Sequence, residues 1–214
     1  MRRQAQAFLL PVLLLSLPAA NGFGQEVPKH VLDHIRSVSV SIEWQGKTHG
    51  SGTLFDNDGE TWCLTANHVV EAAEGKPIRV SQHQAHGKVV SVNAEVAHQD
   101  RKTDIALLKI GKGIFGPGAK FYKECKPPQL DSPIVHCGSM AGLDHTVTRG
   151  YLVGLDRKLE AGQQTYDQAD FTGYYGSSGG GVFLADGRFI GMVTAGIPQR
   201  IVFFVPIRRM KSLP

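Results

Sequence analysis

Twelve short runs of apolar or alternating residues, separated by turn residues about every ten positions, constrain the fold of this chain more than any other feature. They lie at 38–42, 53–55, 62–65, 78–81, 89–96, 105–110, 133–137, 147–154, 168–171, 182–184, 189–194 and 201–205. Runs of this length and spacing predict the strands of an all-β barrel or sandwich. Glycine, at 25 of 214 residues, supplies the turns and lacks the three-residue period of collagen.

Helical patterns are scarce in comparison. They are confined to Gln25–His34, a turn after His68 and a short piece at Ile207–Lys211. A stretch that carries several glycines and prolines, 111–128, divides the predicted strands into two groups of about six. The length therefore suits one domain or two small barrels that share a core.

The first 24 residues have the layout of a secretory signal peptide. Two arginines precede a short apolar run, which ends in small residues near Ala20. The run is shorter than the roughly 20 residues needed to span a bilayer, and two prolines interrupt it. We expect cleavage after Ala20 or Gly24, a mature chain of 25–214 without a stable membrane span, and a periplasmic or extracellular location. An uncleaved N-terminal anchor is the alternative.

Composition excludes several classes of protein. Charged residues make up 20% of the chain and apolar residues 42%, which argues against a disordered polyampholyte and against a membrane bundle. Without the two arginines of the leader, 21 basic residues face 19 acidic ones, so the net charge falls from +4 to +2. This balance is too mild to indicate a nucleic-acid partner.

Three cysteines permit at most one internal disulfide in an exported chain. Cys125 and Cys137 flank a Pro-Pro loop and are the favoured pair, whereas Cys63 lies in an apolar run and is expected to be a small buried hydrophobe. No cysteine spacing is typical of a zinc site. His83 and His86 are closely spaced, but a solvated loop is the expectation there. We predict neither a metal nor a cofactor.

The segment 174–181, YYGSSGGG, places a serine among glycines. A nucleophilic serine needs close approach of the backbone to its substrate, which flanking glycines permit. It also needs main-chain N–H groups that point at the developing oxyanion. In such a loop the amides of Gly176 and Ser178 would supply these donors. A Gly/Ser-rich hairpin loop is the alternative interpretation.

Two further segments each present one residue suited to proton transfer. In 64–70, LTANHVV, an apolar strand ends in a polar turn that presents His68. In 103–110, TDIALLKI, Asp104 opens a strongly apolar strand. An Asp in that place either caps a turn or orients an imidazole and stabilises the imidazolium that forms. A lone His is more often a surface residue than a base, so His68 gains weight only together with the other two motifs.

Taken together, His68, Asp104 and Ser178 follow one another in the chain order His…Asp…Ser. This order distinguishes the chymotrypsin-like enzymes from other folds that carry a serine triad. The segment 50–54, GSGTL, precedes the histidine segment. The joint occurrence of these four segments in an all-β chain favours a serine hydrolase.

From about residue 35 to 210 the chain resembles the trypsin-like serine proteases and, within them, the peptidase domains of HtrA/Deg type. Besides the triad, the matching segments are a Gly-Ser-Gly strand entry, a turn with its following strand, a strand that flanks the specificity pocket and a closing strand, at 50–54, 135–150, 191–196 and 203–207. The resemblance implies two perpendicular six-stranded antiparallel β-barrels, at about 35–112 and 120–207, with the active site in the cleft between them.

Some positions depart from the family pattern. Ser177 replaces the Asp or Asn that usually precedes the nucleophile, and Gly181 replaces the usual Pro. The chain lacks an Arg/Lys-Ile-Val-Gly-Gly start, so no activation by zymogen cleavage is expected. It also ends at Pro214 without a PDZ domain, and the expectation is a bare peptidase domain whose oligomeric state the sequence leaves open.

The resemblance also implies a substrate-binding surface. The hydroxyl of Thr194 is expected to bond Asp104, and the backbone of Thr194, Ala195 and Gly196 to pair with the substrate as an added strand. Thr172, followed by Gly173, stands six residues before the nucleophile where a trypsin-like preference for Arg or Lys needs an acid. Ile201 is expected to project where an open pocket has glycine. The resemblance thus predicts cleavage after a small or medium aliphatic residue.

The predicted function is that of an exported serine endopeptidase that hydrolyses protein or peptide substrates through an acyl-enzyme intermediate. The alternative is a catalytically silent relative that serves as a protein-binding or chaperone-like module. The intact set His68, Asp104 and Ser178 favours the enzyme. A cysteine hydrolase is a weaker alternative, because no cysteine lies in a nucleophile loop.

Overall fold

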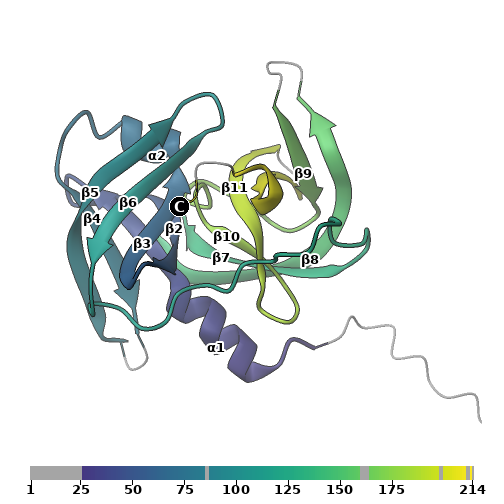
Figure 1. Ribbon diagram of the computed structural model, residues 1–214, viewed down its shortest axis with the longest axis horizontal. Helices are drawn as coiled ribbons and strands as arrows, with labels where there is room; N and C mark the ends of the chain where they lie inside the picture. The colour runs from purple at the N-terminus through teal and green to yellow at the C-terminus, as the bar shows by residue number, and fades with distance from the viewer. Residues whose placement is uncertain (1–25, 85–86, 160–163, 198–199, 211–212, 214) are drawn as a thin grey trace, which may run out of the picture.

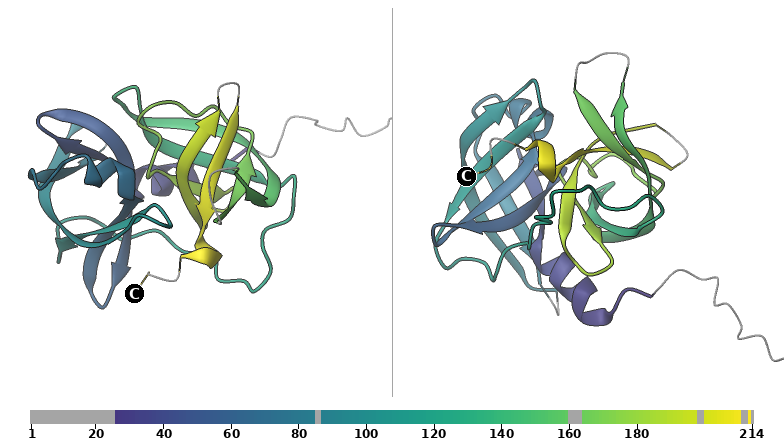
Figure 2. Two further views of the ribbon diagram at one scale, coloured as in Figure 1. Left: turned by 90° about the horizontal axis from the view of Figure 1, so that it is seen from above. Right: turned by 45° about the vertical axis from the view of Figure 1, so that its right-hand side comes forward.

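Two closed β-barrels lie side by side in the computed structural model of this chain (Figures 1 and 2). The structure describes residues 26–84, 87–159, 164–197, 200–210 and 213. The predicted signal peptide, 1–24, lies outside the described residues. All twelve predicted strands are present, six in each barrel and all antiparallel to their neighbours. The prediction of an all-β, chymotrypsin-like double barrel is confirmed.

The first barrel contains the first six strands in the closed order β1-β2-β3-β6-β5-β4. Their bounds are β1 (Ser39–Trp44), β2 (Lys47–Asn57), β3 (Glu60–Ala66), β4 (Ile78–His83), β5 (Val89–Asp100) and β6 (Ile105–Gly111). β3 and β6 are buried over most of their length, which agrees with their nearly continuous apolar sequence. β5 instead alternates between partly buried and exposed residues over its first eight positions, because only one face of this strand turns toward the interior.

The second barrel has the closed order β10-β11-β12-β9-β8-β7. Its strands are β7 (Pro133–Met140), β8 (Leu143–Lys158), β9 (Thr165–Ala169), β10 (Gly181–Leu184), β11 (Phe189–Ile197) and β12 (Ile201–Pro206). β8 is twice as long as its predicted run of 147–154, and it passes through two register shifts against β9. Such irregularities increase the local bend of a strand and help a sheet to close on itself.

The helices are few and short. α1 (Lys29–Val38) buries Val31, Ile35 and Val38, whose spacing of four and three residues defines one helix face. α2 (Asn67–Glu71) follows β3 directly, and the 3₁₀ turn η2 (Ile207–Arg209) follows β12. No helix in the described part of the chain has the length and apolarity to cross a membrane.

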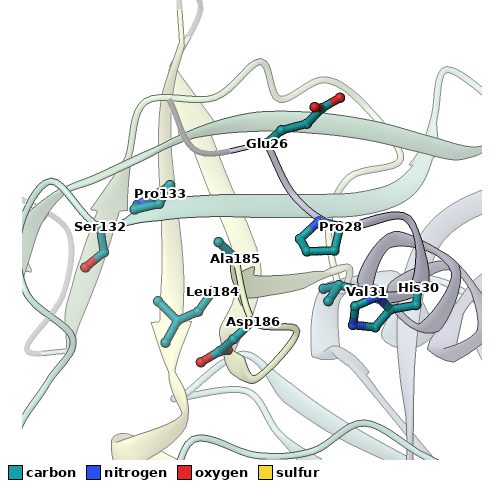
Figure 3. Close-up of a pocket in the computed structure, with 9 residues that line it drawn as sticks. All are labelled: Glu26, Pro28, His30, Val31, Ser132, Pro133, Leu184, Ala185 and Asp186. Atoms are coloured by element: carbon teal, nitrogen blue, oxygen red, sulfur yellow. The ribbon is translucent and has the colours of Figure 1, made fainter. Parts of the chain in front are cut away.

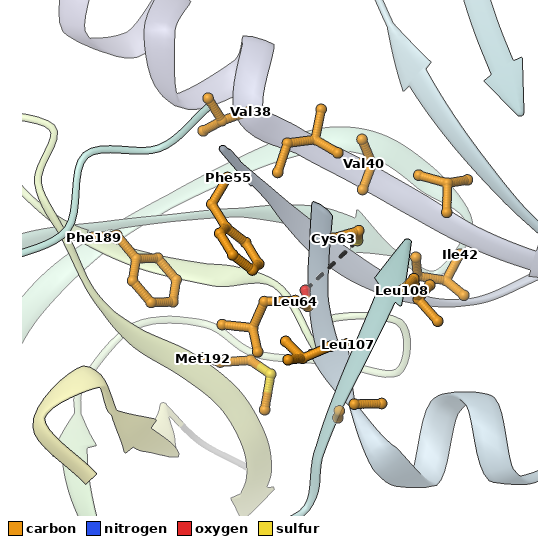
Figure 4. Close-up of a cluster of buried hydrophobic side chains, with 14 of the residues drawn as sticks. Val38, Val40, Ile42, Phe55, Cys63, Leu64, Leu107, Leu108, Phe189 and Met192 are labelled. Carbon is orange, nitrogen blue, oxygen red and sulfur yellow. Dashed lines mark hydrogen bonds between the residues drawn. The ribbon is translucent and has the colours of Figure 1, made fainter. Parts of the chain in front are cut away.

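The core of the first barrel continues into the interface with the second. Phe189 and Met192 of β11 pack beside Phe55 and Leu64 of the first barrel (Figure 4). Phe121, in the segment that connects the barrels, bridges them through ring-centroid distances of 5.5 Å to Phe55 and 5.4 Å to Phe189. A separate cluster fills the second barrel and includes residues of β7, β8, β11 and β12. The two barrels are therefore held together by a shared apolar interface.

The disulfide favoured by the sequence, Cys125–Cys137, is not formed in the structure. Cys63 is also free. Cys137 is buried within β7, whereas Cys125 is exposed on the segment that precedes the barrel, so the two side chains occupy different environments. Cys63 is a buried core residue of β3, and its thiol contacts the carbonyl oxygen of Leu64 at 3.7 Å (Figure 4).

Candidate active site

His68 and Asp104 meet at one end of the first barrel. His68 lies at the start of α2, directly after β3, and Asp104 immediately precedes β6, the strand that pairs with β3. The ring nitrogen His68 Nδ1 is 2.9 Å from Asp104 Oδ2 and 3.0 Å from Oδ1, and the backbone N–H of His68 donates to Oδ1 at 3.0 Å. This carboxylate therefore holds both the ring and the backbone of the histidine.

The backbone of Asp104 is in the left-handed region, with φ of +55°. Asp is among the few non-glycine residues that adopt this conformation readily. Its carbonyl oxygen accepts a hydrogen bond from the backbone N–H of Asn67 at 3.1 Å. The carboxylate oxygen Asp104 Oδ2 also accepts a hydrogen bond from the hydroxyl of Thr194 of β11. The second barrel thus contributes directly to the orientation of a residue on the first.

The pKa values of the pair move in opposite directions. Burial alone would raise the pKa of the Asp104 carboxyl, but hydrogen bonds from His68 and Thr194 together outweigh it and hold that pKa below its ordinary value. The hydrogen bond with Asp104 is the main reason why the pKa of His68 lies above 6.5, against the effect of burial. The carboxylate accepts the proton on Nδ1, which leaves Nε2 of the neutral ring as an acceptor.

The loop that contains Ser178 needs its glycines for steric reasons. Gly176 has φ of +91°, and a Cβ built on it would lie 2.2 Å from the carbonyl oxygen of Ser139. Gly179 has φ of +84°, and its Cβ would lie 2.1 Å from the carbonyl oxygen of Ser51. Both positions combine left-handed backbone with direct contact to another backbone, so no other residue fits without a shift of the loop.

In three successive peptide groups of this loop, the carbonyl oxygen accepts one hydrogen bond. The pairs are Ala141 N–H to Tyr175 O at 2.8 Å, Ser51 Oγ to Gly176 O at 2.6 Å, and Gly180 N–H to Ser177 O at 3.0 Å. Because C=O and N–H of a trans peptide point in opposite directions, the first and third bonds fix the amides of Gly176 and Ser178. Neither of these two amides donates to any residue that the structure describes.

Contacts with the first barrel place Ser178 beside β2. The backbone N–H of Ser51 donates to Ser178 O at 2.8 Å. A Cβ built on Gly50 would lie 3.0 Å from Ser178 O and 2.6 Å from the side chain of Val69, the residue after His68. Within the described residues the hydroxyl of Ser178 makes no hydrogen bond, the His68 ring included.

The expected substrate-binding residues lie on segments around this loop. Thr172 and Gly173 are exposed on the segment before it, and β11 ends in the exposed stretch 195–197. A Cβ built on Gly173 would lie 2.7 Å from Cγ2 of Val202. Val202 therefore faces Gly173, and Ile201, its neighbour at the start of β12, pairs with Ile197.

His136 supports the loop from inside the second barrel. Its ring is fully buried, stacks on Phe171 at a centroid distance of 5.0 Å and interacts with the carbonyl oxygen of Gly181 through Nδ1 at 3.0 Å. A Cβ built on Gly180 would lie 2.6 Å from its Cε1 atom. Burial lowers the pKa of His136 to about 4, despite the opposing effect of the Gly181 carbonyl.

Sequence reasoning did not find the residues that hold the loop. In the sequence, Ser51 stands out only as part of a strand entry, and Ala141 only as part of a turn. Their contribution consists of a hydroxyl and an amide whose partners lie more than thirty positions away along the chain. The one available signal was the pair of glycines around Ser51, because small residues mark a place where another backbone approaches closely.

A separate pocket of about 500 Å³ lies where the start of α1 meets the second barrel (Figure 3). The residues that line it come from 26–31, the start of β7 and the turn between β10 and β11. It contains none of the residues of the candidate active site.

The two closed barrels, with a hydrogen-bonded His–Asp pair on the first and a serine–glycine loop on the second, define a chymotrypsin-like peptidase architecture. The sequence model of the trypsin-like peptidase domain matches residues 50–192. The chain belongs to this family. The resemblance inferred from the sequence is confirmed at the level of family and fold.

Relatives in sequence are proteases of HtrA type. The chain is 30% identical over 173 residues to a probable periplasmic serine endoprotease, DegP-like, of Marinomonas sp. (strain MWYL1), which covers 79% of this chain and 32% of the relative. It is 28% identical over 190 residues to the serine protease Do-like HtrA of Bacillus subtilis (strain 168), covering 83% of this chain and 41% of the relative. The chain thus spans less than half the length of these relatives.

Solved structures agree on the fold. The crystal structure of Deg5 superposes with a TM-score of 0.69 at 24% identity and covers 84% of this chain and 88% of that chain. The HtrA-type protease AlgW, solved with a tripeptide, gives a TM-score of 0.70 at 22% identity over 83% of this chain and 59% of that chain.

Proposed function

We propose that the chain is a serine endopeptidase in which Ser178 is the nucleophile, His68 the general base and Asp104 the residue that orients His68. One observation carries the proposal. His68, Asp104 and Thr194 form a continuous chain of hydrogen bonds. The carbonyl oxygen of Val193, the residue before Thr194, accepts a hydrogen bond from the backbone N–H of Gly179 in the serine loop at 2.8 Å.

The proposed reaction is acyl transfer. Ser178 Oγ forms a bond with the carbonyl carbon of the scissile peptide, and its proton passes to Nε2 of His68. The C–N bond then breaks as His68 returns this proton to the leaving amine. Water, deprotonated by His68 in the same way, hydrolyses the acyl-enzyme. Asp104 stays ionised throughout, in keeping with its lowered pKa, and stabilises the imidazolium.

The amides of Gly176 and Ser178 are the proposed oxyanion donors. They have no partner among the described residues, and the carbonyls of their peptide groups are held by other bonds, so both remain available to a ligand. Fixed donors of this kind lower the barrier because they need no reorientation during the reaction. Each contributes about 3–4 kcal/mol in comparable enzymes.

The substrate is proposed to add as a strand along β11. β10 pairs with β11 only as far as Met192, whereas β12 pairs with it up to Ile197. One edge of the stretch from Thr194 to Gly196 is therefore left without a strand partner in the described part of the chain. Such an edge offers backbone N–H and C=O groups to an extended peptide.

Cleavage is proposed to follow a small or medium aliphatic residue. The segment before the loop offers Thr172 rather than an acid, so a cationic side chain would find no counter-charge there. Val202 closes the space beside Gly173 and limits the depth available to the substrate. A cleavage profile of the purified protein on a peptide library tests this part of the proposal, and preferred cleavage after Arg or Lys would contradict it.

Export to the periplasm or the extracellular space is also proposed. The leader with its two arginines and short apolar run supports it, as do relatives that are named periplasmic. N-terminal sequencing of the protein recovered from the exported fraction tests the cleavage at Ala20 or Gly24.

The nucleophile is tested with a fluorophosphonate probe, which forms a phosphorus–oxygen bond with an activated serine and releases fluoride. We expect the wild type to be labelled at Ser178 and the Ser178→Ala variant to remain unlabelled. Ser177→Ala is the matched control: Ser177 is the adjacent serine, and its buried hydroxyl accepts the amide of Tyr174. Labelling of Ser177→Ala at Ser178 supports the assignment.

A well-folded wild type that takes up no probe would contradict the enzyme and favour the alternative, a binding or chaperone-like module. Circular dichroism and thermal unfolding establish the fold in the same samples. Binding of an unfolded polypeptide without cleavage would then define the activity.

A further inference from the structure

Ser51 of β2 is a fully buried residue whose backbone and side chain both reach the serine loop of the other barrel. Its N–H donates to Ser178 O at 2.8 Å, and its own carbonyl oxygen accepts the hydroxyl of Thr65 at 2.7 Å. These two bonds attach Ser178 to β2 and β2 to β3. Both bonds use backbone groups of residue 51: an N–H, which every residue except proline has, and a C=O, which every residue has. They therefore do not require a serine at this position.

The side chain adds two bonds that only a hydroxyl can make here. Ser51 Oγ donates to the carbonyl oxygen of Gly176 at 2.6 Å and accepts the backbone N–H of Ser139 at 2.8 Å. Ser139 lies near the end of β7, two residues before Ala141, whose amide holds the carbonyl of Tyr175. A single oxygen atom thus bridges the serine loop and the adjacent strand of the second barrel.

The Gly176 carbonyl belongs to the central peptide group of three. The outer two carry the amides of Gly176 and Ser178, and their carbonyls are held by backbone donors of the second barrel, Ala141 and Gly180. The central group alone has its carbonyl held by a side chain, and that side chain comes from the first barrel. Because a glycine backbone rotates more freely than any other, Gly176 depends on such a partner for a single conformation.

We propose that the Ser51 hydroxyl is a positioning group for the oxyanion donors: it fixes the Gly176–Ser177 peptide and so keeps the amides of Gly176 and Ser178 directed at one point. This inference rests on the proposed function. Ser51 does not touch the substrate. Its removal leaves His68, Asp104 and the Ser178 hydroxyl in place, so only the stabilisation of the transition state is weakened.

The test compares Ser51→Ala with Ser41→Ala in the full chain. Ser41 is the matched control because it is also a buried serine and lies opposite Ser51 in the β1–β2 register. Among the described residues, its hydroxyl bonds only to Glu43 and Ser81, both in the first barrel. Each variant is assayed with a peptide ester that has alanine before the scissile bond, and its thermal midpoint is measured.

We expect Ser51→Ala to lower kcat by about 10- to 100-fold, less than the 10²–10³-fold loss of an oxyanion donor itself. KM should change by less than about threefold, and the midpoint of the acidic limb of the pH profile should not move. Ser41→Ala should keep kcat within about twofold of the wild type with a similar loss of thermal stability. A structural role alone would not separate the two variants in kcat.

Equal kcat values in Ser51→Ala and Ser41→Ala would overturn the inference while the wild type remains an active, labelled enzyme. A wild type without fluorophosphonate labelling would instead overturn the proposed function, and the role of Ser51 with it. If Ser51→Ala does not fold, the kcat of Gly138→Ala tests the inference instead. The added Cβ would lie 2.8 Å from Ser51 Oγ and displace the hydroxyl. Gly138→Ala should lower kcat as well, and an unchanged kcat would overturn the inference.

Discussion

The two barrels contribute different kinds of groups to the candidate site. The first supplies side chains: His68 directly follows the strand β3, Asp104 directly precedes its partner β6, and the two side chains bond each other. The second supplies mainly backbone: the loop around Ser178 is held through its carbonyls, and its glycines take conformations that side chains would prevent. The side-chain half depends on residue type, and the backbone half depends on contacts that cross between the barrels.

Two crossing contacts connect these halves in opposite directions. Thr194 of the second barrel donates to Asp104 of the first, and Ser51 of the first donates to Gly176 of the second. Each half of the site is therefore oriented in part by the other. The pair His68–Asp104 has its own internal bonds and should tolerate the loss of its crossing contact better than the loss of Asp104 itself.

The largest effect is expected from Asp104→Asn, which breaks the side-chain half. An amide in place of the carboxylate favours the wrong tautomer of His68 and removes the charge that stabilises its protonated form. We expect kcat to fall by about 10⁴-fold, as for the corresponding change in the serine triad. Steady-state kinetics on a peptide ester measures this loss.

The pH profile of the same variant gives a second measure. His68 acts as a base only when neutral, and Asp104 raises its pKa above 6.5. Activity of the wild type should therefore fall as the pH drops through a midpoint above 6.5, and this midpoint should move down in Asp104→Asn. Asp100→Asn is the control, because in the described part of the chain Asp100 accepts hydrogen bonds only from Lys102 and Thr103 at the same turn. A comparable loss in that variant would point to general damage to the turn.

The same contrast explains how much the sequence could predict. Strand positions followed from apolar periodicity, and the family motifs gave the double barrel and the residues His68, Asp104 and Ser178. These are local signals, carried by residue type and by spacing along a few positions. The contact of Val202, the neighbour of the predicted Ile201, with Gly173 was not predicted, because the face that a strand residue occupies depends on its exact register. The Cys125–Cys137 pair failed because spacing alone does not set the distance between two side chains.

The roles of Ser51 and Ala141 were out of reach for a different reason. Their partners, Gly176 and Tyr175, lie on a distant segment, and a hydrogen bond to a backbone carbonyl leaves no mark on the residue type of its acceptor. Sequence patterns therefore predict the side-chain half of this site better than its backbone half.

A smaller effect, on stability, is expected from His136 in the backbone half. The folded protein binds its proton near pH 4, whereas an unfolded chain binds it near 6.5. The unfolded state therefore holds more protons between these values, so this contribution is complete above pH 6.5 and is lost as the pH falls toward 4. The shift corresponds to about 3 kcal/mol of unfolding free energy.

Denaturant unfolding at several pH values measures that loss. His136→Leu should reduce the dependence of the unfolding free energy on pH across this window, whatever its effect on absolute stability. His30→Gln is the control, because His30 is exposed on α1 and should leave the dependence unchanged. An identical slope in wild type and His136→Leu would contradict the assignment of the acid sensitivity to this buried ring.

A weaker effect on catalysis is expected from Thr194→Val, which removes one crossing contact and nearly preserves the shape of the side chain. Asp104 would keep its bonds from the ring and backbone of His68, so the pair should persist with a raised Asp104 pKa. A hydrogen bond to a charged group contributes about 1.5–3 kcal/mol, and part of this bond should appear as a loss of about tenfold in kcat/KM. Thr194→Ser retains the hydroxyl and should restore most of the activity; a loss in Thr194→Ser without a loss in Thr194→Val would mean that the methyl group matters and the hydroxyl does not.

The smallest effect is expected from Val202→Ala, which changes which substrates are cleaved and leaves the chemistry intact. Val202 faces Gly173 at the segment before the serine loop, so a shorter side chain deepens the space for the residue before the cut. One methylene in such a pocket is worth about 1–3 kcal/mol, and we expect kcat/KM for a leucine peptide to rise about tenfold relative to an alanine peptide. Ile201→Ala is the matched control, since strand alternation turns Ile201 away from Gly173. A change in the cleavage profile that follows Ile201→Ala and not Val202→Ala would show that the pocket is bounded by the residue that the sequence alone suggested.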